Sequence, residues 1–121
     1  MNSSTFPTEI KLHQQSRVLE ISFSDGVTFQ LSCEYLRVFS PSAEVRGHSP
    51  EQAVLQVGKK EVNIKDIQPV GHYAIKLVFD DGHDTGLYSW SYLYDLGKQY
   101  DIYWRDYLGR LAAAGASRDP L

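Results

Sequence analysis

Hydrophobic and polar residues alternate along much of the first ninety positions, a pattern typical of half-buried strands. Segments of this kind predict strands at residues 9–14, 18–23, 27–31, 62–67, 73–79 and 85–88. From Trp90 onward apolar side chains recur at every third or fourth position, which predicts helices. The pattern therefore predicts an α+β fold: a mostly antiparallel sheet of five or six strands, packed by C-terminal helices.

One phrase of this pattern occurs twice, first from Phe23 to Leu36 and again from Phe79 to Leu93. Each copy holds an Asp-Gly pair after a strand, a returning strand, a serine and a Tyr-Leu pair. Asp-Gly predicts a tight hairpin turn of type I′, and the serine hydroxyl can cap a helix. The repeat predicts two hairpin–helix halves with a pseudo-two-fold relation, and chance recurrence of a common hairpin signal is the alternative.

Proline and glycine residues mark the ends of further elements in the chain. A helix is predicted from Cys33 to Phe39, ended by Ser40-Pro41. The connection at 40–60 is the least regular part, and a loop of this length is usually functional or disordered. Near the C-terminus, Gly97 is predicted to end one helix and Asp101 to cap the next.

The length of 121 residues predicts one domain. We expect a flexible N-terminus at 1–8, the domain itself at 9–114 and a tail at 115–121.

Charge and cysteine content narrow the functional classes. The net charge is −3, without the basic stripe that nucleic-acid binding requires, so no nucleic-acid partner is expected. Cys33 is the single cysteine, which excludes an internal disulfide and favours a reducing compartment. No segment has the length and apolar character of a signal peptide or a membrane span. The sequence therefore predicts a cytoplasmic protein with no membrane partner.

Two segments resemble a known bacterial family. They are Leu36–His48, with its Leu-Arg-Val-Phe-Ser-Pro phrase, and Gly86–Gly97, followed by Trp104 and Tyr107-Leu108. Both are similar to the small domain named for the N-terminal region of gamma-butyrobetaine hydroxylase, a domain of unknown function. The resemblance covers about residues 9–110.

The resemblance implies a zinc site whose ligands have changed. In the hydroxylase and its trimethyllysine relative the domain precedes an iron oxygenase domain and holds zinc through three cysteines and one histidine, a closed structural site. The cysteine positions fall on Ser40, Ser42 and Val45, and the histidine falls on His83. Serine hydroxyls are poor zinc ligands and valine has no donor atom. We therefore expect no metal or cofactor, although the loop and the turn should still pack together.

The same resemblance leaves a metal-related alternative. Relatives of this domain also occur fused to P-loop ATPases of iron–sulfur cluster assembly, although this chain has no P-loop motif. It could thus be a metal or iron–sulfur assembly accessory protein that uses His83 and Cys33 to hold zinc or iron. Cys33 begins a predicted helix, where a thiol pKa can be lowered, or it is a small core residue.

No catalytic constellation emerges from the sequence, since oxygenase chemistry needs a separate barrel domain. The acids of the 80–84 turn could bind a cation or act as a base, or be a solvated hairpin end. Arg37 and Arg46 could hold an anion, or pair with Glu44 or the acids of that turn. Dense aromatic residues in the predicted helices favour a recognition surface for an unidentified protein partner. The partner-binding candidates are Arg37, Arg46, Trp90, Tyr94, Tyr100 and Trp104. The sequence leaves the oligomeric state open.

Overall fold

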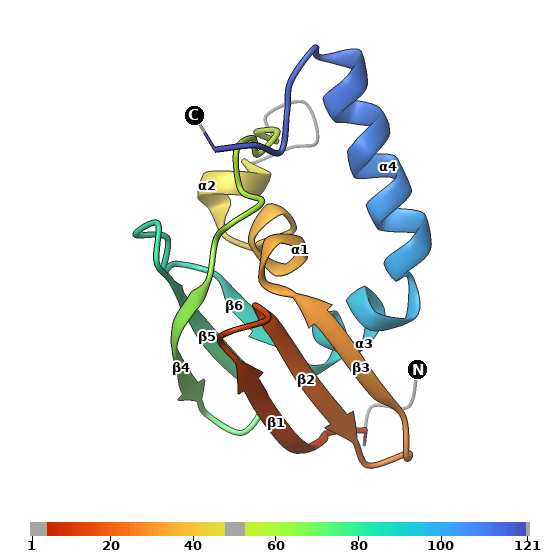
Figure 1. The fold of residues 1–121 in the computed structure, drawn as a ribbon. Coiled ribbons are helices and arrows are strands. Elements are labelled where there is room, and N and C mark those ends of the chain that lie inside the picture. The colour runs from red at the N-terminus through yellow and green to blue at the C-terminus, as the bar shows by residue number, and fades with distance from the viewer. Residues whose placement is uncertain (1–4, 48–52, 121) are drawn as a thin grey trace.

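The computed structural model describes residues 5–47 and 53–120 and shows an α+β fold (Figure 1). The strands are β1 Pro7–His13, β2 Val18–Phe23, β3 Thr28–Ser32, β4 Ile64–Val70, β5 Ala74–Phe79 and β6 Leu87–Ser89. The helices are α1 Cys33–Val38, α2 Ala43–Arg46, α3 Trp90–Lys98 and α4 Tyr100–Ala113. Every strand predicted from alternation is present, whereas the short helix α2 was not predicted.

The six strands divide into two antiparallel sheets of three, in the orders β1-β2-β3 and β4-β5-β6. Side-chain hydrogen bonds link the two sheets, from Gln14 Nε2 to the Ile64 carbonyl and from Asn63 Nδ2 to the Gln14 carbonyl. Both sheets and the helices α1 and α3 supply one hydrophobic core, so neither sheet buries its apolar face alone. Fully buried members of this core are Leu19, Ile21, Leu31, Tyr35, Leu36, Ile64, Leu77, Phe79, Tyr88, Leu93 and Leu96.

The repeated phrase corresponds to two equivalent halves, β1-β2-β3-α1 and β4-β5-β6-α3. In β1 the pairing register shifts directly after Pro7, the partner of Phe23. In β4 it shifts directly after Ile64, the partner of Phe79, so the irregularity occurs at equivalent positions in the two halves. Ser32 and Ser89 cap the two helices, each accepting the backbone N–H three residues ahead. The expected hairpin–helix halves are thus confirmed.

The hairpin turns differ in type from the predicted type I′. Gly26 has φ +88° and Gly82 has φ +90°, but the aspartates before them have ordinary negative φ values. In the first turn, the Gly26 N–H donates to the Phe23 carbonyl and the Phe23 N–H donates to the Val27 carbonyl. This is a three-residue loop with a glycine in the left-handed region. The position of the glycine in the turn was therefore predicted correctly, but the loop has three residues where a type I′ turn has two.

The two halves hold each other through a reciprocal pair of tyrosines. The Tyr35 hydroxyl donates to the carbonyl of Leu96 at 2.7 Å, and the Tyr92 hydroxyl donates to the carbonyl of Phe39 at 2.5 Å. Tyr35 and Tyr92 are equivalent, and each acceptor lies four residues after the equivalent tyrosine. Each helix therefore receives, near its C-terminal end, a hydrogen bond from the other half, which supports the pseudo-two-fold relation.

The C-terminal part is an addition to the second half. Helix α4 runs along one side of the molecule in Figure 1, and Tyr107 and Leu111 are its buried residues. Beyond it, the backbone N–H groups of Gly58 and Lys60 donate to the carbonyls of Ser117 and Arg118. Part of the predicted tail thus contacts the segment before β4 through Ser117 and Arg118.

The prediction that Gly97 ends a helix is wrong. It lies inside α3, and the break before α4 comes at Gln99. No side chain caps α4, so the predicted capping role of Asp101 is also wrong. A Cβ placed on Gly97 would collide with the ring of Phe29 on β3. Glycine is present here because α3 packs closely on the first sheet.

Substituting Gly97→Ala is expected to lower the free energy of unfolding by about 1–3 kcal/mol, because the added methyl group overpacks the contact with Phe29. Gly109→Ala in α4 is the matched control, since nothing lies within 4 Å of its added Cβ. The control should gain up to about 1 kcal/mol from the better helix propensity of alanine. Urea denaturation of both variants measures the difference, and equal effects would contradict the packing role of Gly97.

Candidate functional site

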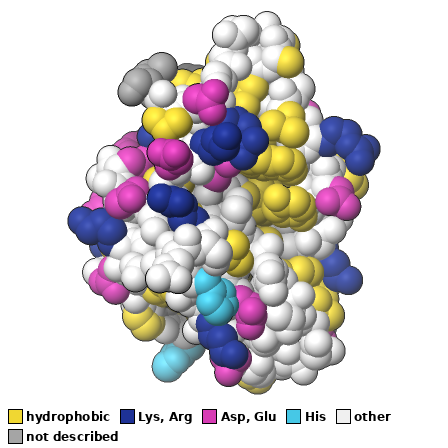
Figure 2. Space-filling model, in the orientation of Figure 1, with side chains coloured by type: hydrophobic (Ala, Val, Ile, Leu, Met, Phe, Trp, Pro, Cys, Tyr) yellow, Lys and Arg dark blue, Asp and Glu magenta, His cyan; other side chains and the backbone are white. Residues whose placement is uncertain are grey.

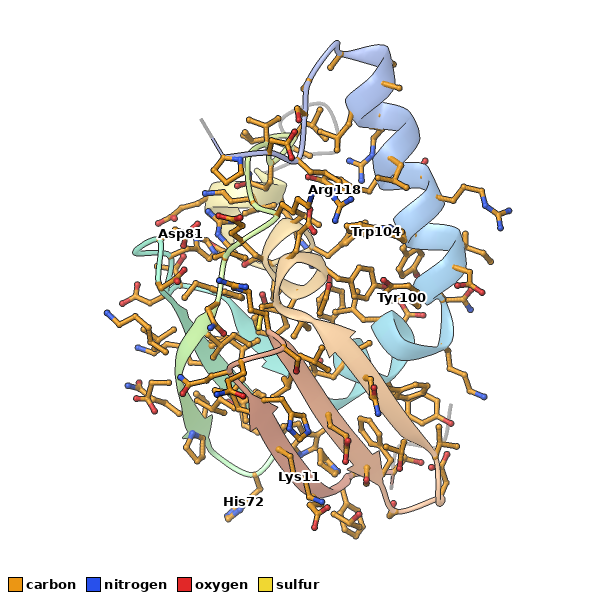
Figure 3. All side chains as sticks on the ribbon, viewed as in Figure 1. Lys11, His72, Asp81, Tyr100, Trp104 and Arg118 are labelled. Carbon is orange, nitrogen blue, oxygen red and sulfur yellow. The ribbon has the colours of Figure 1, made fainter. Side chains whose placement is uncertain are left out.

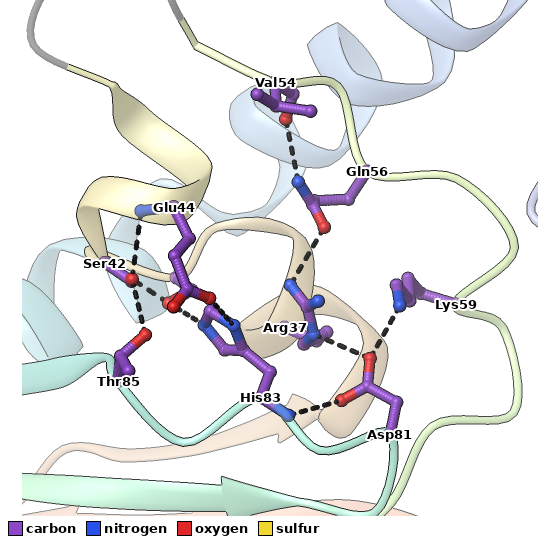
Figure 4. Close-up of polar contacts among 10 residues, drawn as sticks. Arg37, Ser42, Glu44, Val54, Gln56, Lys59, Asp81, His83 and Thr85 are labelled. Atoms are coloured by element: carbon purple, nitrogen blue, oxygen red, sulfur yellow. Dashed lines mark hydrogen bonds and ion pairs between the residues drawn. The ribbon is translucent and has the colours of Figure 1, made fainter.

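A cluster of polar side chains joins the loop after α1 to the β5–β6 turn (Figure 4). We call Ser40, Ser42, Glu44, His83 and Thr85 the polar cluster. Ser40 Oγ lies 2.8 Å from His83 Nε2, and Ser42 Oγ lies 2.6 Å from Thr85 Oγ1. His83 Nδ1 lies 3.3 Å from Glu44 Oε2. The loop of the first half therefore packs on the turn of the second, as the resemblance implied.

Local backbone structure places the serines of the cluster. Ser40 precedes Pro41, and α1 has ended by this point. Ser42 is the N-cap of α2, and its Oγ accepts the Glu44 N–H at 3.2 Å. Ser40 Oγ accepts the Ser42 N–H at 3.2 Å. These local bonds fix both hydroxyls, and a serine followed two residues later by glutamate was the signal from which α2 could have been predicted.

The surroundings of His83 favour its neutral form. Burial of the imidazole and the nearby positive charge of Arg37 lower the pKa of His83, against the opposing effects of Glu44 and Asp81. A carboxylate only accepts hydrogen bonds, so Nδ1 carries the proton that faces Glu44. Nε2 is then an acceptor and receives the Ser40 hydroxyl proton.

The order Ser40–His83–Glu44 is that of a serine hydrolase triad, but the surroundings differ. Ser40 is 1% exposed. A Cβ placed on Gly86 would lie 2.5 Å from Ser40 Oγ, so the backbone of Gly86 covers the hydroxyl. A substrate carbonyl has no room to approach this oxygen. In this arrangement the triad-like contacts connect two chain segments and do not present a nucleophile.

The same residues do not fit a zinc ion. Ser40, Ser42, Val45 and His83 are all buried, as the positions of a closed metal site would be. Their donor atoms are two neutral hydroxyls and one imidazole nitrogen, while Val45 contributes none. Across residues 5–47 and 53–120, no group of three or more His, Cys, Asp or Glu side chains is placed to hold a metal ion. The position where the resemblance implied a metal is thus held together by hydrogen bonds among protein groups.

An ion network lies beside the polar cluster and is formed by Arg37, Gln56, Lys59 and Asp81 (Figure 4). Asp81 Oδ2 lies 2.9 Å from Arg37 Nε and 2.6 Å from Lys59 Nζ. Asp81 Oδ1 accepts the His83 N–H at 3.1 Å. Burial opposes ionisation of this carboxyl, but the hydrogen bonds from Lys59 and His83 and the charge of Arg37 lower its pKa to about 2.

Arg37 is therefore paired with the acidic turn, which is one of the two alternatives that the sequence left open. Its side chain is 9% exposed, and Nη1 donates to Gln56 Oε1 at 3.0 Å. Because its guanidinium makes contacts inside the molecule, Arg37 is not part of the partner surface proposed below.

Cys33 is a core residue. It is fully buried at the first position of α1, and its Sγ contacts Asn63 Oδ1 at 3.7 Å. Burial raises the pKa of the Cys33 thiol to about 11, which outweighs the lowering that a helix N-terminus favours. The thiol is thus protonated at neutral pH, which does not favour metal binding or redox chemistry at Cys33.

The aromatic candidates occupy separate places. On α3, Trp90 Nε1 donates to the His72 carbonyl at 2.7 Å and the Tyr94 hydroxyl donates to Asp25 at 2.6 Å. On α4, the rings of Tyr100 and Trp104 stack with an interplanar angle of 15°. The structure thus brings together Tyr100 and Trp104, whereas Trp90 and Tyr94 lie on the neighbouring helix.

A charged residue that the sequence did not single out completes the α4 surface. The Arg118 guanidinium lies 5.1 Å from the Trp104 ring centre and forms two hydrogen bonds of 2.8 Å with Glu34. Figure 3 shows Tyr100 and Trp104 pointing from α4 toward α1, with Arg118 beside them. We call Tyr100, Trp104 and Arg118 the α4 surface. Because Arg118 lies 14 residues beyond Trp104, sequence spacing alone gave no signal for this contact.

The part of the chain that the structure describes includes no helix with both the length and the apolar character needed to cross a membrane. The irregular connection at 40–60 is described up to Gly47 and again from residue 53, and residues 48–52 lie outside the described residues.

Comparisons with known proteins are consistent across sequence and structure. Residues 10–94 match a family described as gamma-butyrobetaine hydroxylase-like, N-terminal. Two solution NMR structures are similar to the chain at 59% and 49% identity, each with a TM-score of 0.84. They cover 100% and 96% of this chain, and the matches span 90% and 91% of their own lengths. The comparison with curated proteins found no match.

A crystal structure from Acidithiobacillus ferrooxidans ATCC 23270 is also similar, with 41% identity and a TM-score of 0.61 over 75% of this chain and 91% of that one. It is described as a protein with unknown function of the DUF971 family. The family match extends over well more than half of the 121 residues and includes the polar cluster and most of both hairpin–helix halves. The chain therefore belongs to the gamma-butyrobetaine hydroxylase-like, N-terminal family.

Proposed function

We propose that the chain is a non-catalytic protein-binding module whose partner docks on the α4 surface. The main support for this proposal is the hydrophobic side chains that gather on the face between α1 and α4 in Figure 2. Figure 3 labels Tyr100 and Trp104 on the same face. Both rings are half-buried, so part of each packs on the core and part remains exposed. Exposed aromatic area of this kind is typical of a recognition surface.

The contacts around the α4 surface favour binding at low entropic cost. Tyr100 packs against the buried ring of Tyr35 at 4.6 Å between centres, and Trp104 is held between Tyr100 and Arg118. Side chains that are already ordered lose little freedom when a partner arrives. Trp, Tyr and Arg are also the residues enriched at binding hot spots.

The polar groups support a non-catalytic role. Ser40, His83 and Asp81 are the residues whose chemistry resembles that of an active site, and their polar atoms bond to one another or to neighbouring segments. The chemistry of the cluster is therefore used to join the two halves.

Substituting Trp104→Ala should weaken binding of the partner by about 30-fold, as expected when a central aromatic anchor is lost. Ile102→Ala is the matched control, because Ile102 is 62% exposed on the same helix but two positions away, so it points in another direction. Quantitative pull-down from native lysate with the three proteins would compare the captured partners, and circular dichroism would verify that each is folded. If every partner is retained by the folded Trp104→Ala protein, the surface is misassigned.

The alternative, a metal or iron–sulfur accessory role, depends on His83 and Cys33. Metal capture would require Cys33 to lose its proton and His83 to leave Ser40 or Glu44. Elemental analysis of the purified wild-type protein that finds about one metal ion per chain would favour this role over the binding module.

A further inference from the structure

A pocket of about 130 Å³ lies between the end of α1, α2, residues 53–56 and α4. Its lining includes the buried Val38 and Val45, each 7% exposed, and the half-buried Leu55, beside the buried Ser40 and Tyr107. Its exposed lining includes the two guanidinium groups of Arg46 and Arg110. A dry cavity of about 150 Å³ is known to hold benzene, so this pocket fits a hydrocarbon group of about six carbon atoms.

The hydroxyl groups of the residues that line the pocket already have partners. The Tyr107 hydroxyl donates to the Gln56 carbonyl at 2.6 Å, and the Tyr92 hydroxyl donates to the Phe39 carbonyl at 2.5 Å. The Ser40 hydroxyl belongs to the polar cluster. Few of these lining groups therefore remain free to hydrogen-bond a ligand. This favours a ligand whose buried part is apolar.

The two arginines supply positive charge at the mouth. Arg46 lies with its guanidinium carbon 4.7 Å from the Tyr92 ring centre, and that of Arg110 lies 5.9 Å from the Phe39 ring centre. Arg110 also pairs with Asp106 at 3.1 Å, but both side chains are about half exposed or more, and such surface pairs are weak. Arginine has five donors in a planar fork that matches a carboxylate, so donors remain for a ligand.

We propose that this pocket binds a small apolar carboxylate, with the hydrocarbon group between the valines and the carboxylate at Arg46 and Arg110. The proposal goes beyond the binding module and does not depend on the α4 surface. The same chemistry occurs in a free aromatic or branched acid and in the C-terminal residue of a polypeptide. Both sources present one carboxylate attached to an apolar group of this size.

Benzoate is the probe for this pocket, and benzamide is its neutral control of equal shape. Titration of the ¹⁵N-labelled full chain should show saturable amide shifts for Val45, Leu55 and Tyr107 with benzoate, with a dissociation constant of about 1 mM. Benzamide should bind at least about tenfold more weakly. Arg46→Gln and Arg110→Gln should each weaken benzoate binding at least about threefold, while Arg105→Gln, an exposed charge on α4 outside the pocket lining, should leave it unchanged.

Two further probes separate the ligand sources. A tetrapeptide that ends in phenylalanine with a free carboxylate would bind more tightly than benzoate if the natural ligand is a polypeptide C-terminus, and more weakly if it is a free acid. The amidated peptide controls for the carboxylate. The proposal is overturned if benzamide or inorganic phosphate binds as well as benzoate, if both arginine variants bind benzoate normally, or if Arg105→Gln weakens binding equally. Loss of the Trp104 partner interaction alone would leave this result unaffected, so the two proposals fail separately.

Discussion

One zinc ion per chain is expected to bind to the variant that combines Ser40→Cys, Ser42→Cys and Val45→Cys. The three positions are those of the cysteines in the zinc-holding relatives that the sequence resembles, and His83 supplies the fourth ligand. The positions are buried together, with Ser40 Oγ 2.8 Å from the His83 Nε2 atom that would face the metal. Three thiolates and one imidazole complete a closed tetrahedral set. Because metal binding free energy adds to folding free energy, zinc should strongly stabilise the variant.

Elemental analysis of the reduced, zinc-loaded and desalted variant measures the stoichiometry, and thermal unfolding with zinc or with a chelator measures the linkage. Wild-type protein should show no zinc-dependent change in melting temperature. Adding His83→Ala to the triple variant should weaken zinc binding at least about tenfold, because one ligand is lost. If the folded triple variant retains well under one zinc per chain, the loop after α1 and the β5–β6 turn are not arranged as a metal site.

Asp81→Asn is expected to lower the free energy of unfolding at pH 7 by about 3–5 kcal/mol, a large part of the 5–15 kcal/mol that folded domains usually have. The substitution leaves the Arg37 guanidinium, with a side chain only 9% exposed, without its anionic partner. A buried charge that has lost its partner costs far more than an exposed one. Urea denaturation of the two proteins measures the effect.

The same carboxylate gives the effect a predictable pH dependence. The pKa of Asp81 is about 2 in the folded protein, below the ordinary value of 3.8, so its stabilising contribution is complete above about pH 4. The contribution falls as the pH drops from about 4 toward 2, so the stability difference between wild type and Asp81→Asn should narrow in acid. Asp84→Asn removes an exposed carboxylate from the same part of the chain and should change stability little at any pH. A stability difference that stays constant down to pH 2.5 would contradict the assignment to Asp81.

Local sequence signals predicted the elements well because their causes are local. Strand β2 has the predicted bounds, since alternation between buried and polar positions is a property of the strand itself. Ser32 and Ser89 cap their helices as expected, because a capping hydroxyl needs only the next few residues. The break before α4 was misplaced at Gly97, since the reason for that glycine is Phe29, a residue on a distant strand.

The candidate site was predictable only in part. The resemblance placed Ser40, Ser42, Val45 and His83 together, and the structure buries all four, with Ser40 hydrogen-bonded to His83 across the contact between the two halves. Glu44 and Thr85 were missed as partners, because their contacts depend on how α2 and the second turn approach each other. The carboxylate pocket was equally hidden, since Val38, Leu55 and Arg110 come from three separate segments.

The reciprocal tyrosines give the single chain the symmetry of a dimer. In an isologous interface, a contact from position i of one copy to position j of the other is always accompanied by the contact from j to i. Tyr35 to Leu96 and Tyr92 to Phe39 are such a pair within one molecule. The fold can thus be viewed as two covalently joined protomers of β-β-β-α type. The α4 surface, the polar cluster and the pocket are features that the two protomers do not share. The two proposed binding sites therefore lie where one protomer's environment differs from the other's.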